Sequence, residues 1–298
     1  MDNSDIILKL AEGDVRTIAK TLTLVENESE GSKELLAHMP FDRKVPIIGI
    51  TGPPGAGKSS VVNACITKLM EQDKKVAVLA VDPSSPFNYG SLLGDRVRME
   101  AHFNNENVFI RSVASRGHLG GLSTRIYEMA DVLRNAHFDY IFIETVGVGQ
   151  SEVEIAGIAD ITVVVLVPEA GDDVQAMKSG VMEIADVFVV NKSDREGAGR
   201  FASTLKTLIH TQDRNVEVIS AVAIKSEGID ELLLEIDKLH QNNGLDEKKV
   251  HLLAHRTWSL LSAQLMKRFQ YEEVVNELKG AMQQTNFNIY RYIQNKLQ

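Results

Sequence analysis

The glycines between Gly52 and Ser59 have the spacing of a phosphate-binding loop, because they fit the Walker A pattern G-x-x-x-x-G-K-[ST]. Such a loop turns successive backbone N–H groups toward one point, and glycine reaches the required dihedral angles without placing a Cβ near the ligand. Lys58 would then reach the β- and γ-phosphates, and the Ser59 hydroxyl would ligate Mg²⁺. The residues expected to surround the phosphates are Gly52, Pro53, Pro54, Gly55, Ala56, Gly57, Lys58, Ser59 and Ser60.

The segments on either side of this loop decide whether the motif is genuine. The apolar run Val45–Ile50 before it predicts a buried parallel strand. The segment that begins at Ser59 predicts a helix whose positive dipole end faces the loop, which favours a bound anion. A chance glycine-rich turn would lack this order of strand, loop and helix, so we interpret the stretch as a nucleotide-binding loop.

Acidic residues follow two later strand candidates, where metal ligands are expected. Tyr140–Ile143 leads into Glu144, and Gly147 follows three residues later. This arrangement is typical of a Walker B strand and switch, in which the acid holds Mg²⁺ through water and the glycine N–H contacts the γ-phosphate. Asp82, after another apolar run, could also serve the Mg²⁺ held by Ser59. Its Asp-Pro-Ser context is equally compatible with an ordinary turn.

Two further polar residues stay open on spacing alone. Asp95 stands beside Arg96 and close to Arg98, and such an exposed acid usually forms only a solvated ion pair. Gln150 could orient the attacking water, or it could be a plain surface residue, because it lies later than the corresponding glutamine of Ras-like proteins.

The tetrapeptide Asn191–Asp194 fits the pattern N-K-x-D at the end of an apolar strand candidate. The Asp194 carboxylate can accept hydrogen bonds from guanine N1–H and from the exocyclic amine, whereas adenine presents an acceptor and no second donor. An unpaired buried carboxylate would penalise adenine strongly. Asn191 and Lys192 complete the motif, and a backbone N–H at Ser220 or Ala221 could support guanine O6. The sequence therefore predicts GTP or GDP as the nucleotide.

Strand and helix candidates alternate along the chain, which predicts an α/β fold with a mostly parallel sheet, as in P-loop NTPases. The strand candidates are Val45–Ile50, Val76–Val81, Val108–Ser112, Tyr140–Ile143, Ile161–Val167, Val187–Val190 and Val216–Ile219. The helix candidates are Ser59–Gln72, Leu122–Asn135, Gly171–Glu183, Gly199–His210 and Ile229–Gln241. The active site of such a sheet lies at the carboxyl ends of its strands.

Helical extensions flank this core, and we divide the chain into an N-terminal arm 1–42, a P-loop GTPase domain 43–243 and a C-terminal segment 244–298. In the arm, Asp14 is expected to cap a helix with Ile18 and Leu22 on one face. Short amphipathic helices must pack on the core or on another chain. The C-terminal segment has a long apolar stripe that includes Trp258 and Leu261, which favours dimerisation over packing on the core.

Composition excludes several classes of protein. Across 298 residues the hydrophobic fraction of 44% and charged fraction of 24% are ordinary for a globular protein. A formal charge of −9 argues against nucleic-acid or anionic-membrane partners. The single cysteine, Cys65, argues against disulfides and cysteine-rich metal sites. No apolar run has a transmembrane length, and the first residues lack a leader profile, so we expect a cytoplasmic protein.

Together these motifs resemble those of the methylmalonyl-CoA mutase-associated GTPases. That family consists of P-loop GTPases that chaperone adenosylcobalamin-dependent acyl-CoA mutases, and some relatives carry the older label of arginine/ornithine transport system kinase. The resemblance covers nearly the whole chain. The matching stretches are Thr21–Asn27, Gly52–Ser59, Ala80–Ser85, Gly94–Met99, Glu144–Glu152 and Asn191–Asp194. Two variable positions of the loop, Pro54 and Ala56, often differ in relatives without altering the N–H geometry.

The resemblance implies roles that spacing alone leaves open. Its acidic residues around Mg²⁺ match Asp82, Asp95 and Glu144. It makes Glu169–Val181 a third switch loop that relays the mutase partner to hydrolysis, although the residues alone indicate only an exposed helix start. The polar residues that match this switch, expected to act in catalysis with Lys58, are Asp172, Gln175 and Lys178.

The implied reaction is GTP + H₂O → GDP + phosphate, with Mg²⁺ as cofactor and with hydrolysis timing the loading or release of the mutase cofactor. The resemblance also implies protection of the mutase and a homodimer formed through the C-terminal helices. Because the chain lacks a D-x-H-x-x-G motif, we expect no cobalamin site of its own.

Other functions remain open on the sequence. A metallochaperone GTPase would need soft or imidazole ligands, and the eight histidines are scattered. A small-molecule or protein kinase would need an acceptor site and a base, and N-K-x-D favours guanine where most kinases use adenine. A nucleotide-gated scaffold with incidental hydrolysis is the third alternative.

Overall fold

The computed structural model describes residues 2–40, 45–82, 99, 102, 105–114, 125–145, 154–168, 181–211, 216–242, 247–266, 268–269, 271–282 and 287–297. These residues fall into two compact units, Met1–Asn243 and Gly244–Gln298. The predicted boundary at 42/43 falls on residues outside the described ranges, as does the one at 243/244.

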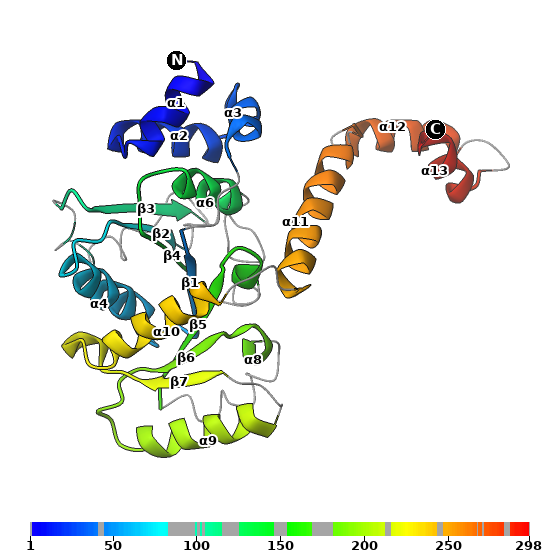
Figure 1. Ribbon diagram of the computed structural model, residues 1–298. Coiled ribbons are helices and arrows are strands. Elements are labelled where there is room, and N and C mark those ends of the chain that lie inside the picture. Colours follow the sequence, from blue (N-terminus) through cyan, green and yellow to red (C-terminus); the bar gives the residue numbers. More distant parts are fainter. Residues whose placement is uncertain are drawn as a thin grey trace. The chain divides into compact units, whose positions relative to one another are not determined.

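The first unit contains a seven-stranded parallel sheet in the order β3-β2-β4-β1-β5-β6-β7 (Figure 1). Each strand lies within two residues of its predicted range, so the predicted α/β fold is confirmed. The sequence locates the strands well because most of them are short, buried apolar runs, although β3 and β7 are only partly buried. The strands are β1 Ile47–Thr51, β2 Val76–Asp82, β3 Val108–Ala114, β4 Tyr140–Glu144, β5 Ile161–Leu166, β6 Val187–Val190 and β7 Glu217–Ser220.

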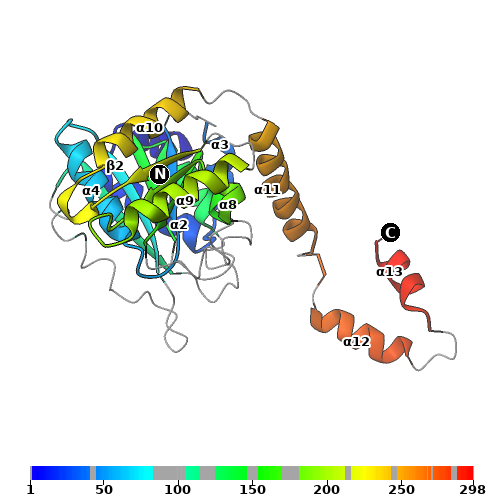
Figure 2. The same ribbon diagram turned by 90° about the horizontal axis from the view of Figure 1, so that it is seen from below.

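Helices cover both faces of the sheet. On one face, α4 (Lys58–Met70) and α10 (Ile229–Gln241) pack over Ile48, Ile50 and Phe142. On the other, α6 (Ile126–Arg134) packs over the alternate residues, Ile47, Ile141 and Ile143. Figures 1 and 2 show this layering. The second face continues over β6 and β7 with α8 and α9, and the described residues of this unit also form the 3₁₀ turns η2 and η4. The bounds of these elements are α8 Val181–Ile184, α9 Ala198–Thr211, η2 Ile155–Gly157 and η4 Ala223–Lys225.

The N-terminal arm packs on the α6 face of the same unit, which decides between the two partners left open by the sequence. Its helices are α1 Asn3–Ala11, α2 Val15–Glu26 and α3 Ser32–His38. Asp14 caps α2 as predicted: its carboxylate accepts the N–H of Thr17 at 2.9 Å. The Thr17 hydroxyl also donates to this carboxylate and lowers the pKa of Asp14. Arg111 of β3 then joins the arm to the sheet through Glu26 (2.5 Å).

Aspartates fix the strand register at the amino edge of the sheet. Three of them immediately precede a strand, and each makes the same reciprocal contact with a residue in, or directly before, the neighbouring strand: its carboxylate accepts that residue's N–H, and its own N–H donates to that residue's carbonyl. The pairs, with the distance from partner N–H to carboxylate, are Asp139 with Lys75 (2.7 Å), Asp160 with Ile47 (3.0 Å) and Asp186 with Thr162 (2.8 Å). Buried Arg134 also pairs with Asp160.

The second unit consists of α11 (Glu247–Met266), α12 (Tyr271–Ala281) and α13 (Ile289–Leu297). Glu277 of α12 accepts the hydroxyl of Tyr292 at 2.7 Å and also pairs with Lys296 of α13. Large apolar side chains are exposed along all three helices, including Val250, Leu253, Trp258, Leu260, Leu261, Leu265, Met266, Tyr271, Ile289, Tyr290 and Ile293. Within the described ranges, no helix combines the length and apolarity needed to cross a membrane.

Candidate functional site

The loop between β1 and α4 has the backbone conformation that its glycines predict. Gly52 has φ +137°, and a Cβ there would lie 2.1 Å from the carbonyl oxygen of Val165 in the neighbouring strand β5. Gly57 has φ +88°, and a Cβ there would lie 2.4 Å from Nδ2 of Asn191. At these two positions both the dihedral angle and the space exclude a side chain, so the loop can pass close to β5 and to Asn191.

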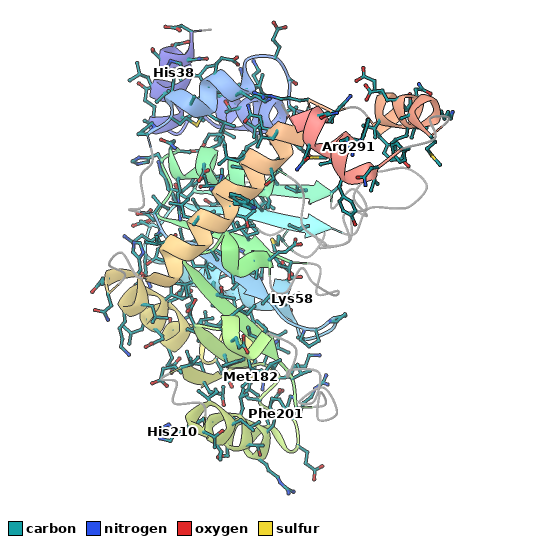
Figure 3. All side chains as sticks on the ribbon, turned by 90° about the vertical axis from the view of Figure 1, so that its right-hand side faces the viewer. His38, Lys58, Met182, Phe201, His210 and Arg291 are labelled. Carbon is teal, nitrogen blue, oxygen red and sulfur yellow. The ribbon has the colours of Figure 1, made fainter. Side chains whose placement is uncertain are left out.

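Lys58 begins α4 and folds back over the loop. Its Nζ donates to the carbonyls of Gly52 at 2.9 Å and Pro53 at 3.2 Å, and the residue is buried. Figure 3 labels Lys58 beside the sheet. The ammonium group and the N-terminus of α4 therefore concentrate positive charge at the loop, as an anionic ligand requires.

Ser59 and Glu144, two of the predicted metal ligands, meet where β1 and β4 end. Strands β1 and β4 pair with Ile50 opposite Glu144, and the Ser59 hydroxyl donates to Glu144 Oε1 at 2.6 Å. Both residues are 3% exposed. A hydroxyl and a carboxylate are hard oxygen donors of the kind that Mg²⁺ prefers, so this pair fits a magnesium ion.

The backbone of Asp82, another predicted metal ligand, lies at the same edge of the sheet as Glu144. Strand β2 pairs with β4, with Ala80 opposite Glu144, so the backbone of Asp82 lies two residues further along at the same edge. Asp95 lies outside the described residues. Among the described residues, no group of three or more His, Cys, Asp or Glu side chains converges on one point. Burial raises the pKa of Cys65 to about 12, so its thiol stays protonated and is a poor metal ligand.

Asn191 ties the guanine motif to the phosphate loop. Its Nδ2 donates to the carbonyl of Ala56 at 2.9 Å, and its Oδ1 accepts the N–H of Ala223 at 3.1 Å. Lys192, at φ +56°, donates from Nζ to the carbonyl of Gly55 at 2.8 Å. Sequence reasoning assigned these residues only to the guanine motif and missed their contacts with the loop, because the partners lie 135 and 137 residues away.

Asp194, which is predicted to bind guanine, is exposed, unlike Asn191. Nζ of Lys225 lies 3.9 Å from its carboxylate. The N–H of Ser193 donates to the carbonyl of Ala221 at 3.0 Å, which joins the two predicted guanine loops. The N–H of Ala221 itself donates to the carbonyl of Val190 at 2.9 Å. A contact from this N–H to guanine O6 would therefore have to replace that bond.

Several predicted residues lie outside the described ranges. They are Asp95, Gly147, Gln150, Asp172, Gln175 and Lys178. The described site therefore consists of the phosphate loop, the Ser59–Glu144 pair and the guanine motif, all at the carboxyl edge around β1. Strands β2, β3 and β4 lie on one side of β1, and β5, β6 and β7 lie on the other. Ligand sites of open α/β sheets are expected at such a switch in strand order.

Comparison with known proteins identifies the family. The family model of the methylmalonyl Co-A mutase-associated GTPase MeaB matches residues 18–274. GTPase ArgK of Escherichia coli (strain K12) is 38% identical over 242 residues, covering 77% of this chain and 73% of that protein. A fused isobutyryl-CoA mutase of Geobacillus kaustophilus (strain HTA426) is 36% identical over 206 residues, which are 65% of this chain and 19% of that protein.

A solved structure agrees with these sequence matches. The crystal structure of a LAO/AO transport system kinase superposes with a TM-score of 0.66 at 29% identity, covering 99% of this chain and 90% of that one. The family model spans well over half of the chain, and the E. coli relative is a GTPase that covers more than two thirds of it. The chain therefore belongs to the MeaB family of methylmalonyl-CoA mutase-associated GTPases, and it is a GTPase.

Proposed function

We propose that this GTPase uses Mg²⁺ to hydrolyse GTP and serves as a chaperone of an adenosylcobalamin-dependent acyl-CoA mutase, gating cofactor loading or release and protecting the mutase. The observation that carries the mutase partner is the relative from Geobacillus kaustophilus. It has a segment 36% identical to this chain within a protein described as a fused isobutyryl-CoA mutase. Joining a GTPase segment and a mutase in one polypeptide keeps the two at a high effective concentration. Separate chains reach the same proximity by binding each other, which supports a mutase as the partner.

In the proposed reaction, this chain's residues bind and position the nucleotide. Lys58 and the loop N–H groups hold the β- and γ-phosphates, and Ser59 and Glu144, with Asp82 and Asp95, hold Mg²⁺. The ion, when bound, neutralises charge that develops on the γ-phosphoryl group. Because Lys58 already lies across the loop, its side chain needs little reorganisation when the phosphates bind.

The remaining predicted residues have separate proposed roles. Gly147 would contact the γ-phosphate through its N–H, and Asp194 would select guanine through its carboxylate. The third switch would use Asp172, Gln175 and Lys178 to couple the mutase to hydrolysis. Slow intrinsic turnover is expected if these residues act only when the partner orders them.

The second unit supports the proposed homodimer. Along α11 the side chains of Trp258, Leu261 and Leu265 are 72%, 53% and 53% exposed. α12 contains no buried residue. Helices whose apolar side chains stay exposed gain stability by packing on a second copy, where these side chains leave water. We expect a dimer in size-exclusion chromatography with light scattering, and a monomer after Trp258→Glu and Leu261→Glu together.

The decisive experiment measures hydrolysis of GTP and of ATP by the purified chain, with and without a purified adenosylcobalamin-dependent mutase. We expect GTP hydrolysis that the mutase changes and little ATP hydrolysis. Lys58→Ala should remove hydrolysis in both conditions, and undiminished activity would refute the role of the loop. Rapid ATP use would favour a kinase or an ATPase. No effect of any cobalamin mutase would refute the proposed partner while leaving the GTPase activity intact.

A further inference from the structure

Two buried threonines join the strand before the phosphate loop to the strand that carries Glu144. The hydroxyl of Thr145 donates to Oγ1 of Thr51 at 3.1 Å, and the N–H of Thr145 donates to the carbonyl of Ile50 at 3.0 Å. Thr51 is 0% exposed and Thr145 2%. Thr51 immediately precedes Gly52, and Thr145 immediately follows Glu144, so this contact lies at the two points where the site residues leave the sheet.

The threonines lie on the opposite face of the sheet from the metal-binding pair. Side chains alternate along a strand, and in β4 Phe142 packs toward α4 whereas Ile141 and Ile143 pack toward α6. Glu144 therefore points to the α4 side, where it meets Ser59, and Thr145 points to the α6 side. The bonds of Thr145 to β1 therefore hold the backbone on the α6 side, while the carboxylate of Glu144 contacts Ser59 on the α4 side.

A second contact brings the chain back to the same strand. A Cβ on Gly49 would lie 2.5 Å from Cγ1 of Ile155 and 2.9 Å from Cβ of Ala159, so the turn η2 packs directly on the backbone of β1. Residues 146–153 connect Thr145 with η2 in the sequence. The flanks of this segment thus contact β1 only two residues apart, at Thr51 and at Gly49.

We infer that Thr51 and Thr145 are positioning residues for the GTPase reaction. Their hydroxyl bond holds Glu144 at the distance where its carboxylate meets Ser59. The inference rests on the proposed role of Glu144 in holding Mg²⁺. Neither threonine touches a phosphate in this role, so they act on the rate and on the use of the metal, and binding of GDP through the loop is largely spared.

Removing one hydroxyl or both separates the effect on the hydrolysis rate from the effect on the stability of the fold. Thr145→Val keeps the side-chain shape but leaves the Thr51 hydroxyl buried without its partner, which destabilises the fold. Thr51→Val together with Thr145→Val replaces the polar contact by an apolar one, so stability should return. The hydrogen bond that positioned Glu144 does not return, so the rate should stay low.

The test compares Thr145→Val, Thr145→Ser, Thr51→Val and the double valine variant, all as the full chain without mutase. Thr162→Val is the matched control, because Thr162 is 1% exposed and lies at the amino end of β5, away from the site. The readouts are kcat and KM for GTP, the Mg²⁺ concentration that gives half of the maximal rate, and the free energy of unfolding.

For Thr145→Val we expect kcat to fall about tenfold, less than the roughly hundredfold loss that a 1 Å misplacement can cause. KM for GTP should change little, and the Mg²⁺ requirement should rise several-fold. Thr145→Ser should restore most of the rate, and Thr162→Val should change none of these kinetic values. The double valine variant should regain stability but not rate.

Three results would overturn the inference. They are an unchanged rate and Mg²⁺ requirement in folded Thr145→Val, an equal loss of rate in Thr162→Val, and a double variant that regains its rate together with its stability. A wild-type chain that hydrolyses GTP without Mg²⁺ would refute the proposed metal role itself, and it would do so before any threonine is changed. The two failures are therefore distinguishable.

Discussion

Asn191 connects the phosphate loop with the second guanine loop, so truncating it should weaken nucleotide binding far more than the loss of one contact. Asn191→Ala removes the partner of the Ala56 carbonyl (2.9 Å) and of the Ala223 N–H (3.1 Å). Ala56 is 0% exposed and Ala223 5% exposed, so water reaches neither group easily in the intact fold. Both groups would lose their partner inside the protein.

The magnitude follows from the cost of burying an unpaired polar group. Each orphaned group costs about 1–3 kcal/mol. Some water can enter the space that Asn191 vacates and recover part of this, so we expect a total of about 2–4 kcal/mol. At about 1.4 kcal/mol for each tenfold change, the Kd for GDP should rise between roughly 30-fold and 700-fold if the whole cost falls on the bound state.

Isothermal titration calorimetry with GDP and urea unfolding of the free chain apportion this cost. If Asn191 holds the two loops in the shape that GDP needs, affinity falls and the stability of the free chain falls less. Asn135→Ala is the matched control, because it also removes an Nδ2 donor 2.9 Å from a backbone carbonyl, at the end of α6. GDP affinity of Asn191→Ala within twofold of the wild type, in a folded protein, would refute this reasoning.

Three further predictions follow from the described contacts. Gly52→Ala should abolish GDP binding, because the new Cβ would lie 2.1 Å from a backbone carbonyl of β5, whereas Gly199→Ala, with no atom within 4 Å of its new Cβ, should bind normally in the same titration. Asp160→Ala should lower the free energy of unfolding in urea by about 3 kcal/mol, since it leaves a buried arginine without its carboxylate; a loss below about 1 kcal/mol would contradict this role. Burial lowers the pKa of His102 in the folded protein below its ordinary value of 6.5. The neutral histidine is therefore favoured in the fold, so its contribution to the free energy of unfolding is fully present above pH 6.5 and is lost as the pH falls toward the folded pKa. His102→Gln should remove this part of the pH dependence when unfolding is compared at about pH 7.5 and about pH 5.5, and an identical pH profile would count against it.

The sequence predicted the parts of this molecule that are encoded locally. Val187–Val190 and the strands β1, β2, β4 and β5 are short, mostly apolar runs that the fold buries. The glycines of Gly52–Ser59 have the spacing that a phosphate-binding loop needs. Such features need no knowledge of the rest of the chain. The capping of α2 by Asp14 was predictable for the same reason, because its partner Thr17 is three residues away.

The contacts between these parts were not predictable in the same way. Thr51 and Thr145 are 94 residues apart, and they meet only because β4 inserts between β2 and β1 in the sheet. No periodicity in either segment specifies that neighbour. The partner of the N-terminal arm was equally open, because an amphipathic helix shows that a face must be covered but not which surface covers it.

The N-terminal arm also has a consequence for synthesis of the protein on the ribosome. Glu26 meets Arg111 across 85 residues of sequence, so α2 emerges well before the strand and helix that it packs on. At about 5–20 residues per second, this separation corresponds to a wait of roughly 4–17 s. During that time the apolar residues Ile18 and Leu22 lack α6 and β3 to pack on, and α2 relies on its cap at Asp14 and on its contacts with α1 and α3. The arm is therefore the part of the first unit where a nascent-chain chaperone would be needed earliest.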